Sequence, residues 1–427
     1  MLQVNFIREH KDRILAGLKT RNFPEADLSL IDRVLELDDQ RKALQTELDE
    51  AKAQRNQQSA EVGALFKKGK KAEAEAIREQ VGVLKERIAQ IEEGLKSVMA
   101  ERIEVLLQIP NVPHDSVPPG HTDEDNEVYQ AWTGDLPDLA ADALPHWELA
   151  KKYNILDMEL GTKITGSGFP VFRGKGARLQ RALISFFLDE AAKAGYEEIV
   201  PPLLVNEDTA RATGQLPDKE GQMYYVEKDN LYLIPTAEVP VTNIFREAIL
   251  NKDDLPVKLT GYTPCFRREA GSYGAHVRGL NRVHQFDKVE IVQIAHPEQS
   301  YTVLEDMLLH IGGLLNKLEL PYRVLRLCGG DLGFTAALTF DFEVYSAAQK
   351  RWLEVSSASN FETYQSNRLK LRFRESEGKK PQLAHTLNGS ALALARIIAA
   401  LLENNQTSEG IVIPKALQEY TGFDRIN

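Results

Sequence analysis

The amino-acid sequence predicts an α+β protein in which an antiparallel β-sheet carries flanking helices and is preceded by an N-terminal antiparallel two-helix coiled coil. Apolar residues repeat with heptad spacing over the first quarter of the chain, which is typical of a coiled coil. Strand-like runs in the remainder follow one another through short connections, which favours antiparallel pairing. No GxxxxGK[ST] or strand–GxGxxG–helix sequence occurs, so the phosphate-binding loops of doubly wound folds are not expected.

The bulk composition is that of an ordinary soluble protein. The chain has 427 residues, 43% of them hydrophobic and 27% charged, enough for two or three domains. A formal net charge of -11 argues against a generally basic surface but leaves room for a local basic patch. Cys265 and Cys328 are far apart and form no Cys-x-x-Cys, so we expect no zinc and no disulfide framework. The charged N-terminus and the lack of a long apolar run predict a cytoplasmic protein.

The expected coiled coil follows a short helix, Phe6–Lys19, that ends near Asn22 and Pro24. Its second half has a seam with alternating steps of four and three, at Ile77, Val81, Leu84, Ile88, Ile91, Leu95, Val98, Arg102 and Val105. The first half has a matching seam, at Val34, Leu37, Leu44, Leu48, Ala51, Val62 and Leu65. Polar residues interrupt this seam at Arg41, Arg55 and Gln58. They are surface contacts or seam defects, and the pattern does not decide between the two.

A lysine-rich break, Lys67-Lys68-Gly69-Lys70-Lys71, separates the two halves. The break predicts a hairpin with arms about 50 Å long at ~1.5 Å per residue. A dimerisation coil is an equally good reading of the heptads alone. The lysines at the bend favour a polyanionic partner, although such a turn by itself is usually a solvated loop.

The rest of the chain mixes helices and strands after a proline-containing linker, Pro110–Asp125. A helix at Leu179–Ala194 leads into a strand at Glu197–Val200 and then Pro201-Pro202. Further strands are expected at Leu231–Ile234, Lys258–Tyr262, Val289–Ile294, Tyr322–Leu327, Leu338–Val344 and Trp352–Val355.

One hairpin, Cys265–Glu290, carries an unusual density of charge. Its charged residues include Arg267, Arg268, Arg278, Arg282, Glu269, Asp287 and Glu290. Exposed ion pairs contribute only about 0–1 kcal/mol each, so stability does not explain the arginines. Guanidinium groups match phosphate oxygens, and carboxylates can hold an amine or a base edge. The hairpin therefore predicts a site for an anionic ligand.

Three further clusters could carry chemistry. Thr236-Ala237-Glu238 follows a strand, and as a helix cap it would be unremarkable. Glu354-Val355-Ser356-Ser357 is expected to end a strand, and His385–Ser390 to open an apolar helix bearing Arg396. Both have capping as a structural alternative, but a buried arginine needs an anion or π partner. His284 and His385 lack paired histidines at metal-ligand spacing, so we expect them to be structural.

Taken together, these residues resemble the seryl-tRNA synthetases of the common bacterial type, a family of class II aminoacyl-tRNA synthetases. The resemblance spans essentially the whole chain. It is carried by the helical hairpin and by GTKITGSGFPVFRGKGARL, GQLPDKEGQMY, IPTAEVPVTN, FRREAGSYG, HQFDKVE and HTLNGSALALARIIAALLENNQ. It implies a class II catalytic domain built on an antiparallel sheet, and a homodimer.

The resemblance implies an ATP site at Arg267, Arg268, Glu269, Val283, Phe286, Glu354, Val355, Ser356, Ser357 and Arg396. Arg267 would hold the α-phosphate and the serine carboxylate. Glu269 would meet the adenine amino group, with Phe286 and Arg396 on the two adenine faces. Glu354 and Ser357 would bind Mg²⁺, and Arg267, Arg396 and Glu354 form the catalytic set. The loop Gly271–Gly279 would close on ATP.

The implied serine site consists of Thr236, Ala237, Glu238, Arg267, Glu290, Asn388 and Ser390. Thr236 and Glu238 would grip the amine, while Glu290 and Ser390 would surround the hydroxyl. Residues 1–109, with the hairpin at about 28–107, would form the tRNA-binding domain, and residues 110–427 the catalytic domain with its linker. Lys67, Lys68, Lys70 and Lys71 would contact tRNA(Ser), and by extension tRNA(Sec).

Two alternatives belong to other functional classes. One is a relative that forms an aminoacyl-adenylate but charges a carrier protein, and the intact heptads argue against it. The other is a non-catalytic RNA-binding relative. Its expected signature is loss of Arg267, Glu269, Glu354 or Arg396, and all four are present.

Overall fold

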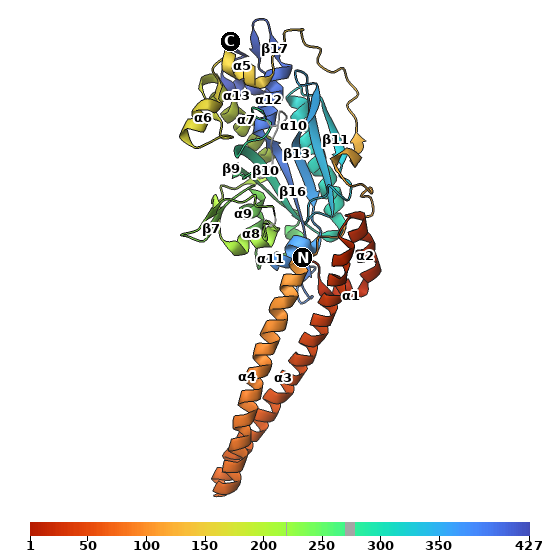
Figure 1. Ribbon diagram of the computed structural model, residues 1–427, viewed down its shortest axis with the longest axis vertical. Coiled ribbons are helices and arrows are strands. Elements are labelled where there is room, and N and C mark those ends of the chain that lie inside the picture. The colour runs from red at the N-terminus through yellow and green to blue at the C-terminus, as the bar shows by residue number, and fades with distance from the viewer. Residues whose placement is uncertain (219, 270–277) are drawn as a thin grey trace. The chain divides into compact units, whose positions relative to one another are not determined.

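The computed structural model describes residues 1–218, 220–269 and 278–427 (Figure 1). Most of the loop Gly271–Gly279, expected to close on ATP, lies outside the described residues. The chain divides into two compact units. One contains Met1–Lys19 and Phe23–Pro110, and the other contains Thr20–Asn22 and Asn111–Asn427. Among the described residues, no helix is both long and apolar enough to cross a membrane.

The first unit is entirely helical. Where one N-terminal helix was expected there are two, α1 (Val4–Glu9) and α2 (Lys11–Thr20), because the backbone leaves the helical conformation at His10. After a 3-10 turn at Glu25–Ser29, α3 (Leu30–Lys67) and α4 (Lys71–Gln108) form the long hairpin. Each helix has 38 residues, which is about 57 Å at ~1.5 Å per residue. Gly69 turns the chain between them with a φ of 76°, a conformation that glycine adopts without strain.

Heptad residues fill the contact between α3 and α4. The buried positions are Val34, Leu37, Leu48, Ala51, Val81, Leu84, Ile88, Ile91 and Val105, all of them predicted. The three polar seam residues are half-buried and have polar contacts within the same unit. Arg41 donates to Asp38, Arg55 to Asn56 and Gln58 to Gln80. They are therefore polar members of the seam, which the sequence pattern left open.

The second unit is organised by an eight-stranded sheet with the order β1-β11-β12-β13-β16-β10-β9-β4. The strands are β1 (Glu127–Gln130), β4 (Glu197–Glu198), β9 (Val257–Phe266), β10 (Gln285–Ala295), β11 (Tyr322–Arg326), β12 (Leu338–Ser346), β13 (Arg351–Asn360) and β16 (His385–Ala393). All neighbours are antiparallel except β4 and β9. This confirms the expected antiparallel sheet.

Smaller elements complete this unit. They are α5 (His146–Lys152), β2 (Leu156–Asp157), α6 (Met158–Ile164), β3 (Val171–Phe172), β5 (Leu204–Val205), α8 (Glu207–Thr213), β6 (Tyr225–Val226), β7 (Leu231–Leu233), α9 (Glu238–Asn243), β8 (Ile249–Asn251), α11 (Thr363–Leu369), β14 (Arg372–Arg374), β15 (Gln382–Leu383), β17 (Gln406–Thr407), β18 (Gly410–Val412), α13 (Lys415–Thr421) and β19 (Arg425–Ile426), with single 3-10 turns at Asp123–Asp125, Lys252–Asp254 and Pro297–Gln299.

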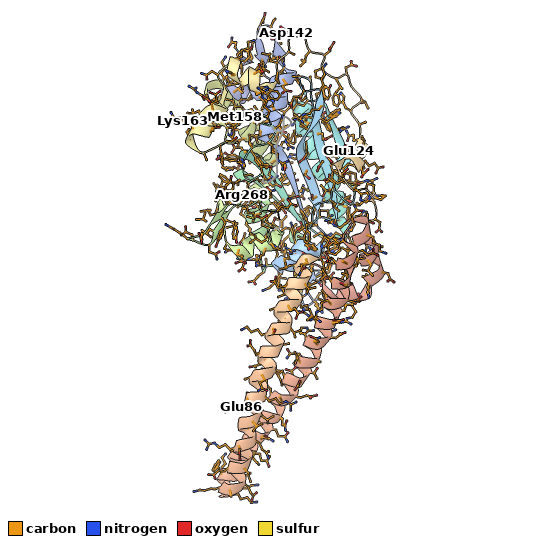
Figure 2. The ribbon with its side chains drawn as sticks, viewed as in Figure 1. Glu86, Glu124, Asp142, Met158, Lys163 and Arg268 are labelled. Atoms are coloured by element: carbon orange, nitrogen blue, oxygen red, sulfur yellow. The ribbon has the colours of Figure 1, made fainter. Side chains whose placement is uncertain are left out.

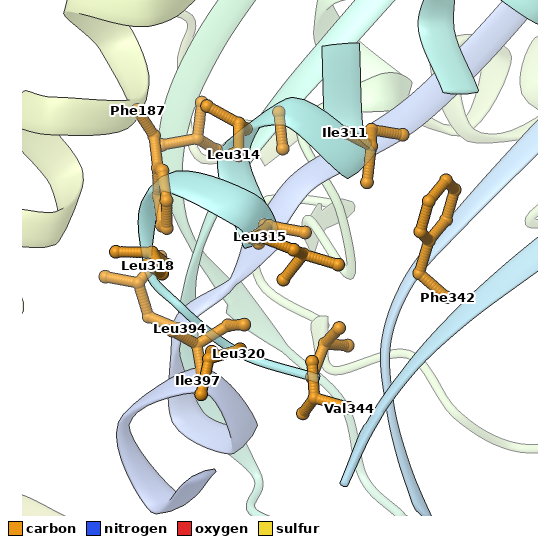
Figure 3. Packing of buried hydrophobic residues seen from close by; sticks show 14 of the residues in the cluster. Phe187, Ile311, Leu314, Leu315, Leu318, Leu320, Phe342, Val344, Leu394 and Ile397 are labelled. Carbon is orange, nitrogen blue, oxygen red and sulfur yellow. The ribbon is translucent and has the colours of Figure 1, made fainter. Parts of the chain in front are cut away.

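Three helices cover one face of the sheet: α7 (Gly174–Lys193), α10 (Ser300–Lys317) and α12 (Leu394–Asn404). Figure 3 shows Leu315 of α10 close to Val344 of β12, and Phe187 of α7 beside α10. Side chains alternate along a strand, so Val289 and Ile291 of β10 join this core. Their neighbours point to the opposite face, where the polar residues gather.

Two predicted element boundaries are wrong. His385–Ser390 was expected to open a helix, but it belongs to the central strand β16, and the helix begins only at Leu394. Glu354-Val355-Ser356-Ser357 was expected to end a strand, but β13 continues to Asn360. Both segments are paired in the sheet interior, and this long-range pairing overrides the local turn and capping preferences of Asn, Gly and Ser.

Candidate active site

A cavity of about 970 Å³ lies on the polar face of the sheet. Of the residues predicted for ATP and serine, those that line it are Thr236, Glu238, Arg267, Glu269, Val283, Phe286, Glu290, Glu354, Val355, Ser356, Ser357, Asn388, Ser390 and Arg396. They come from segments far apart in the sequence. The structure therefore brings nearly all the predicted residues into one place.

Two predicted residues are not among the lining. Ala237 is fully buried next to Val241 and Leu259. Arg268, labelled in Figure 2, is exposed, and its backbone N–H donates to the carbonyl of Gln222 at 2.9 Å.

The buried end of the cavity is built by β10 and β16. Glu290 lies directly opposite Ser390 in the antiparallel register. Lys288, two residues earlier on the same face, places its Nζ 2.5 Å from Oε2 of Glu290 and donates to Thr236 Oγ1 at 2.8 Å. The Lys288–Glu290 contact is not aligned as a hydrogen bond, since Oε2 of Glu290 has no hydrogen-bond donor. A buried carboxylate oxygen thus faces the cavity with unused accepting capacity.

Glu238 begins α9 and is 6% exposed. Gln365 Nε2 donates to its Oε1 at 2.6 Å. Burial, together with the charge of Glu290, raises the pKa of Glu238 to about 7. Burial also raises the pKa of Glu290, against the opposing charge of Lys288. Two carboxylates and an ammonium therefore share one desolvated pocket, where each charge depends on the others.

Arg267 lies between this pocket and the aromatic part of the cavity. Its guanidinium carbon is 5.2 Å from the centre of the Phe286 ring, within the range of a cation–π contact. Its Nε donates to the carbonyl of Pro235 at 3.3 Å. Nearby, Glu269 has a φ of 49° and forms an ion pair with Arg282. The sequence had given Arg282 no assignment.

Glu354 and Ser357 face the same side of β13 although they are three residues apart. In a regular strand they would point to opposite faces. A register shift lies between Phe342 and Glu343 of the neighbouring strand, so that Glu354 pairs with Glu343 and Ser357 with Asp341. Two strand residues then oppose one, which is a β-bulge. The bulge turns both predicted metal ligands into the cavity.

Asp341 joins this pair as a residue that the sequence did not single out. Ser357 Oγ donates to Asp341 Oδ1 at 2.6 Å. Burial and the neighbouring Glu354 charge raise the pKa of Asp341 well above its ordinary value. Carboxylate and hydroxyl oxygens are the ligands that Mg²⁺ prefers, so this donor set fits the expected ion. The described residues contain no group of three or more His, Cys, Asp or Glu side chains arranged to hold a metal on their own.

Arg396 lies in the first turns of α12 and is half-buried at the cavity edge. Its Nε donates to the carbonyl of Asn281 at 2.9 Å, and its Nη1 donates to the carbonyl of Glu354 at 2.7 Å. Two backbone carbonyls thus hold the guanidinium plane. Asn281 and Lys288 also line the cavity but were missed in the sequence. Lys288 stands in HQFDKVE at alternating spacing from Glu290, and that spacing was the available signal.

The two predicted histidines have ordinary hydrogen bonds. His284 Nδ1 is 3.1 Å from the carbonyl of Arg267, and His385 Nδ1 is 2.8 Å from Oγ of Ser300. In the helical unit, the lysines at the bend are exposed, and Lys70 contacts Glu73 at 2.9 Å.

Two family models match the chain. One is described as the seryl-tRNA synthetase N-terminal domain and matches residues 1–113. The other is described as the tRNA synthetase class II core domain (G, H, P, S and T) and matches residues 224–405. A serine–tRNA ligase from Salinibacter ruber is 51% identical over 427 residues, covering 100% of this chain and 99% of the relative. One from Chlorobium phaeobacteroides is 46% identical, covering 100% of both.

Solved structures are similar over the same length. A seryl-tRNA synthetase from Pyrococcus horikoshii complexed with ATP has a TM-score of 0.91 at 33% identity, covering 100% of this chain and 99% of that chain. A cytoplasmic serine–tRNA ligase from Naegleria fowleri in complex with AMP has a TM-score of 0.86 at 27% identity, with the same coverage. The similarity thus includes both the helical unit and the sheet.

Proposed function

The chain belongs to the seryl-tRNA synthetase family of class II aminoacyl-tRNA synthetases, and from this premise we propose that it activates L-serine with ATP and transfers serine to the 3′ end of tRNA(Ser). The observation that carries the proposal for serine is the buried pocket in which Glu290 faces Ser390 beside Thr236 and Glu238. The pocket offers carboxylates for an amine and an acceptor for a hydroxyl.

ATP is proposed to occupy the part of the cavity lined by Phe286, Val283 and Arg396. The related Pyrococcus protein was solved with ATP, and these residues suit a nucleotide chemically. An aromatic ring and a guanidinium plane can hold the two faces of a base. Arg267, whose guanidinium lies over Phe286, is close enough to change partners from the ring to a phosphate. Glu269 is proposed to accept from the adenine amino group once it leaves Arg282.

Serine activation needs no protein nucleophile. The serine carboxylate attacks the α-phosphorus of ATP, the bond to the β-phosphate oxygen breaks, and seryl-adenylate and diphosphate result. The chain's contribution is to align the two reactants and to neutralise the charge that develops at the α-phosphate. Arg267 is placed for both tasks, since it lies between the serine pocket and Phe286. A ribose hydroxyl of tRNA then attacks the adenylate carbonyl and releases AMP.

Magnesium is part of the proposal at Glu354 and Ser357, with Asp341 behind Ser357. When bound, the ion would neutralise phosphate charge. Asp341 accepts the Ser357 hydroxyl proton and thereby turns the lone pairs of that hydroxyl toward the cavity. Arg396 is held by the Glu354 carbonyl, which links the position of this strand to the guanidinium.

Selection for serine follows from the buried acceptor at Glu290. A site built to bind a hydroxyl rejects analogues that lack it, because its polar groups would stay unpaired. Oε2 of Glu290 is buried without a hydrogen-bond donor, so alanine and glycine would leave it so. Threonine carries the hydroxyl and would have to be excluded by lack of room for its methyl group.

The helical hairpin of residues 28–107 is proposed to bind tRNA, with Lys67, Lys68, Lys70 and Lys71 near its tip contacting phosphates. We include tRNA(Sec) as a second substrate, and a cytoplasmic homodimer as the working form. Exposed apolar side chains at Val200 and Leu204, 86% and 42% exposed, are typical of a surface that a partner covers.

Serine-dependent exchange of labelled diphosphate into ATP tests the first step. The purified chain should catalyse exchange with serine but not with alanine, glycine or threonine. Charging of tRNA(Ser) and tRNA(Sec) transcripts tests the second step. Exchange without charging of either tRNA would support a carrier-protein ligase instead, and no exchange with any amino acid would support a non-catalytic RNA-binding relative.

A further inference from the structure

His146, the first residue of α5, is completely buried and does not line the described cavity. Its Nδ1 is 2.7 Å from Oε1 of Glu403, and its Nε2 accepts the backbone N–H of Leu280 at 2.8 Å. The backbone N–H of His146 also donates to Glu403, at 2.9 Å. A side chain remote from the reacting atoms therefore uses both ring nitrogens.

These contacts fix the tautomer of the ring. A backbone N–H can only donate, so Nε2 of His146 must carry a lone pair. In the neutral ring the proton is then on Nδ1, which donates it to Glu403. The imidazole is thus a rigid connector that donates at one end and accepts at the other.

Glu403 is a hub at the far end of the helix that carries Arg396. It is fully buried, accepts from Ser346 Oγ and accepts from Gln349 Nε2 at 2.9 Å. Burial alone would raise its pKa, but the hydrogen bonds from His146 and Ser346 outweigh burial and lower it. Glu403 is therefore an anion that needs its donors in place.

From this hub a hydrogen-bonded path leads to the ATP side of the cavity. Gln349 Oε1 accepts from Asn281 Nδ2 at 2.9 Å, and the Asn281 carbonyl accepts from Arg396 Nε at 2.9 Å. Leu280, held by His146, is the residue directly before Asn281. The Asn281 carbonyl is thus fixed from both sides, by His146 through the backbone and by Gln349 through the side chain.

The same short helix holds the two residues before Leu280. A Cβ atom on Gly279, which has a φ of 68°, would lie 2.3 Å from Nε2 of His146, so only glycine permits this close approach. The Arg278 guanidinium carbon is 4.9 Å from the centre of the Trp147 ring. Segment 278–281 therefore rests on His146 and Trp147 over its whole length.

We propose that His146 and Glu403 form a buried positioning pair that fixes segment 278–281 and, through the Asn281 carbonyl, sets the guanidinium plane of Arg396 for ATP. This inference rests on the proposed function, because it assumes that Arg396 covers the adenine. His146 is a positioning residue, since it acts through Leu280 and Asn281 and touches no substrate.

Two substitutions separate the two ends of the ring. In His146→Asn the amide can still donate to Glu403 from the place of Nδ1, but nothing accepts the Leu280 N–H. In His146→Gln the amide oxygen can accept that N–H from the place of Nε2, while the donor to Glu403 is lost. An unpaired buried N–H is costly enough to shift the segment. We therefore expect His146→Asn to raise the KM for ATP roughly tenfold and His146→Gln to restore it to near the original value.

The measurement is serine-dependent diphosphate exchange in the full-length protein, with KM for ATP, KM for serine and kcat determined separately. The KM for serine should change little, because β10 and α9 do not contact His146. His114→Asn is the matched control, since His114 bonds Ser116 and has no connection to Arg396, and it should leave the KM for ATP unchanged.

Equal KM values for ATP in both His146 variants, with only a lower melting temperature or kcat, would overturn the proposal in favour of a purely structural histidine. If His146→Asn cannot be purified folded, Gln349→Ala decides: it cuts the path between Glu403 and Asn281 at a half-buried residue, and an unchanged KM for ATP there would also overturn the proposal. Absence of exchange in the original protein is a distinct result, which would refute the proposed function itself.

Discussion

Nζ of Lys288 lies 2.5 Å from Oε2 of Glu290 in the buried wall of the cavity, and the same ammonium donates to Thr236 Oγ1 at 2.8 Å. Lys288 is 5% exposed and Glu290 is 1% exposed. The pair is therefore screened from water, and neither charge can be removed without leaving the other uncompensated. It also joins β10 to the segment that begins α9, the two sides of the proposed serine pocket.

Replacing Lys288 by methionine should destabilise the protein by about 3–5 kcal/mol, as breaking a buried ion pair does. Urea unfolding measures the change. Lys317→Met is the matched control, because Lys317 pairs with Glu190 at the surface and is 51% exposed. Such a pair contributes about 0–1 kcal/mol. Equal losses in the two variants would mean that Lys288 is not a specially buried cation.

Glu290→Ala should remove the selection of serine more than the binding of ATP. The variant no longer has a buried acceptor for the hydroxyl, so the ratio of kcat/KM for serine over alanine should fall at least about 100-fold. Diphosphate exchange with both amino acids measures the ratio, and the KM for ATP should stay within a factor of about three. A serine preference that survives intact would refute the role of Glu290.

The pH dependence of serine binding should follow Glu238. Its pKa is raised to about 7 by burial and by the charge of Glu290, so the carboxylate that would grip the amine forms only as pH rises through that value. The KM for serine should therefore fall between about pH 6 and pH 8. In Glu238→Gln this dependence should vanish and the KM should be high throughout.

The sign for stability is opposite, because a raised folded-state pKa favours the protonated form. The contribution of Glu238 is fully present below its ordinary pKa and is lost as pH rises through about 7. Between about pH 5 and pH 8, Glu238→Gln should therefore gain stability relative to the original protein, by up to roughly 3 kcal/mol. A constant difference between the two proteins would show that Glu238 is not buried as described.

Asp38, inside the helical unit, should be essential to the base of the hairpin. Its carboxylate meets Arg8, Arg41, Lys42 and Arg102 at 2.6–3.3 Å. Burial opposes its ionisation, but the bonds from Lys42 and Arg41 outweigh burial and lower its pKa to about 2. Its contribution is thus present above about pH 4 and lost as pH falls toward 2.

Asp38→Asn should therefore cost about 2 kcal/mol at neutral pH. Faster hydrogen exchange in α3 and α4 of the full-length protein would report the loss. The adjacent Asp39 is the control: it also pairs with Arg8, but it is 59% exposed, and Asp39→Asn should cost less than about 1 kcal/mol.

Alanine at Lys67, Lys68, Lys70 and Lys71 should weaken tRNA charging and leave serine-dependent exchange unchanged. Each lost phosphate contact should reduce the slope of log affinity against log salt by roughly 0.7–0.9. Lys379→Ala with Lys380→Ala is the control, because both lysines are exposed in the other unit. Deletion of Leu30 to Val105 should abolish charging while sparing exchange, and full charging by that variant would refute the arm's role.

The helical hairpin was predictable because its determinants are local. The heptad residues are close in sequence, and Gly69 marks the turn between them, so periodicity alone gave α3, the bend and α4 within a few residues. The break between α1 and α2 at His10 was not predictable, because no glycine or proline marks it.

Within the site, prediction succeeded where a residue type carries its chemistry in any context. Arg267, Glu290 and Arg396 stood out because charge in an apolar setting demands a partner. Lys288 and Asp341 were missed because their importance comes from neighbours on other strands. His146 and Glu403 are 257 residues apart, and no pattern in the sequence connects them.

The sequence by itself determined the coiled coil, the antiparallel sheet and the residue types of the site, because periodicity and charge are properties of short segments. Only the tertiary structure decided that His385–Ala393 is a central strand, that a bulge turns Glu354 and Ser357 to one face, and which cations compensate the buried carboxylates. These outcomes depend on strand pairing and desolvation, which involve residues far apart along the chain.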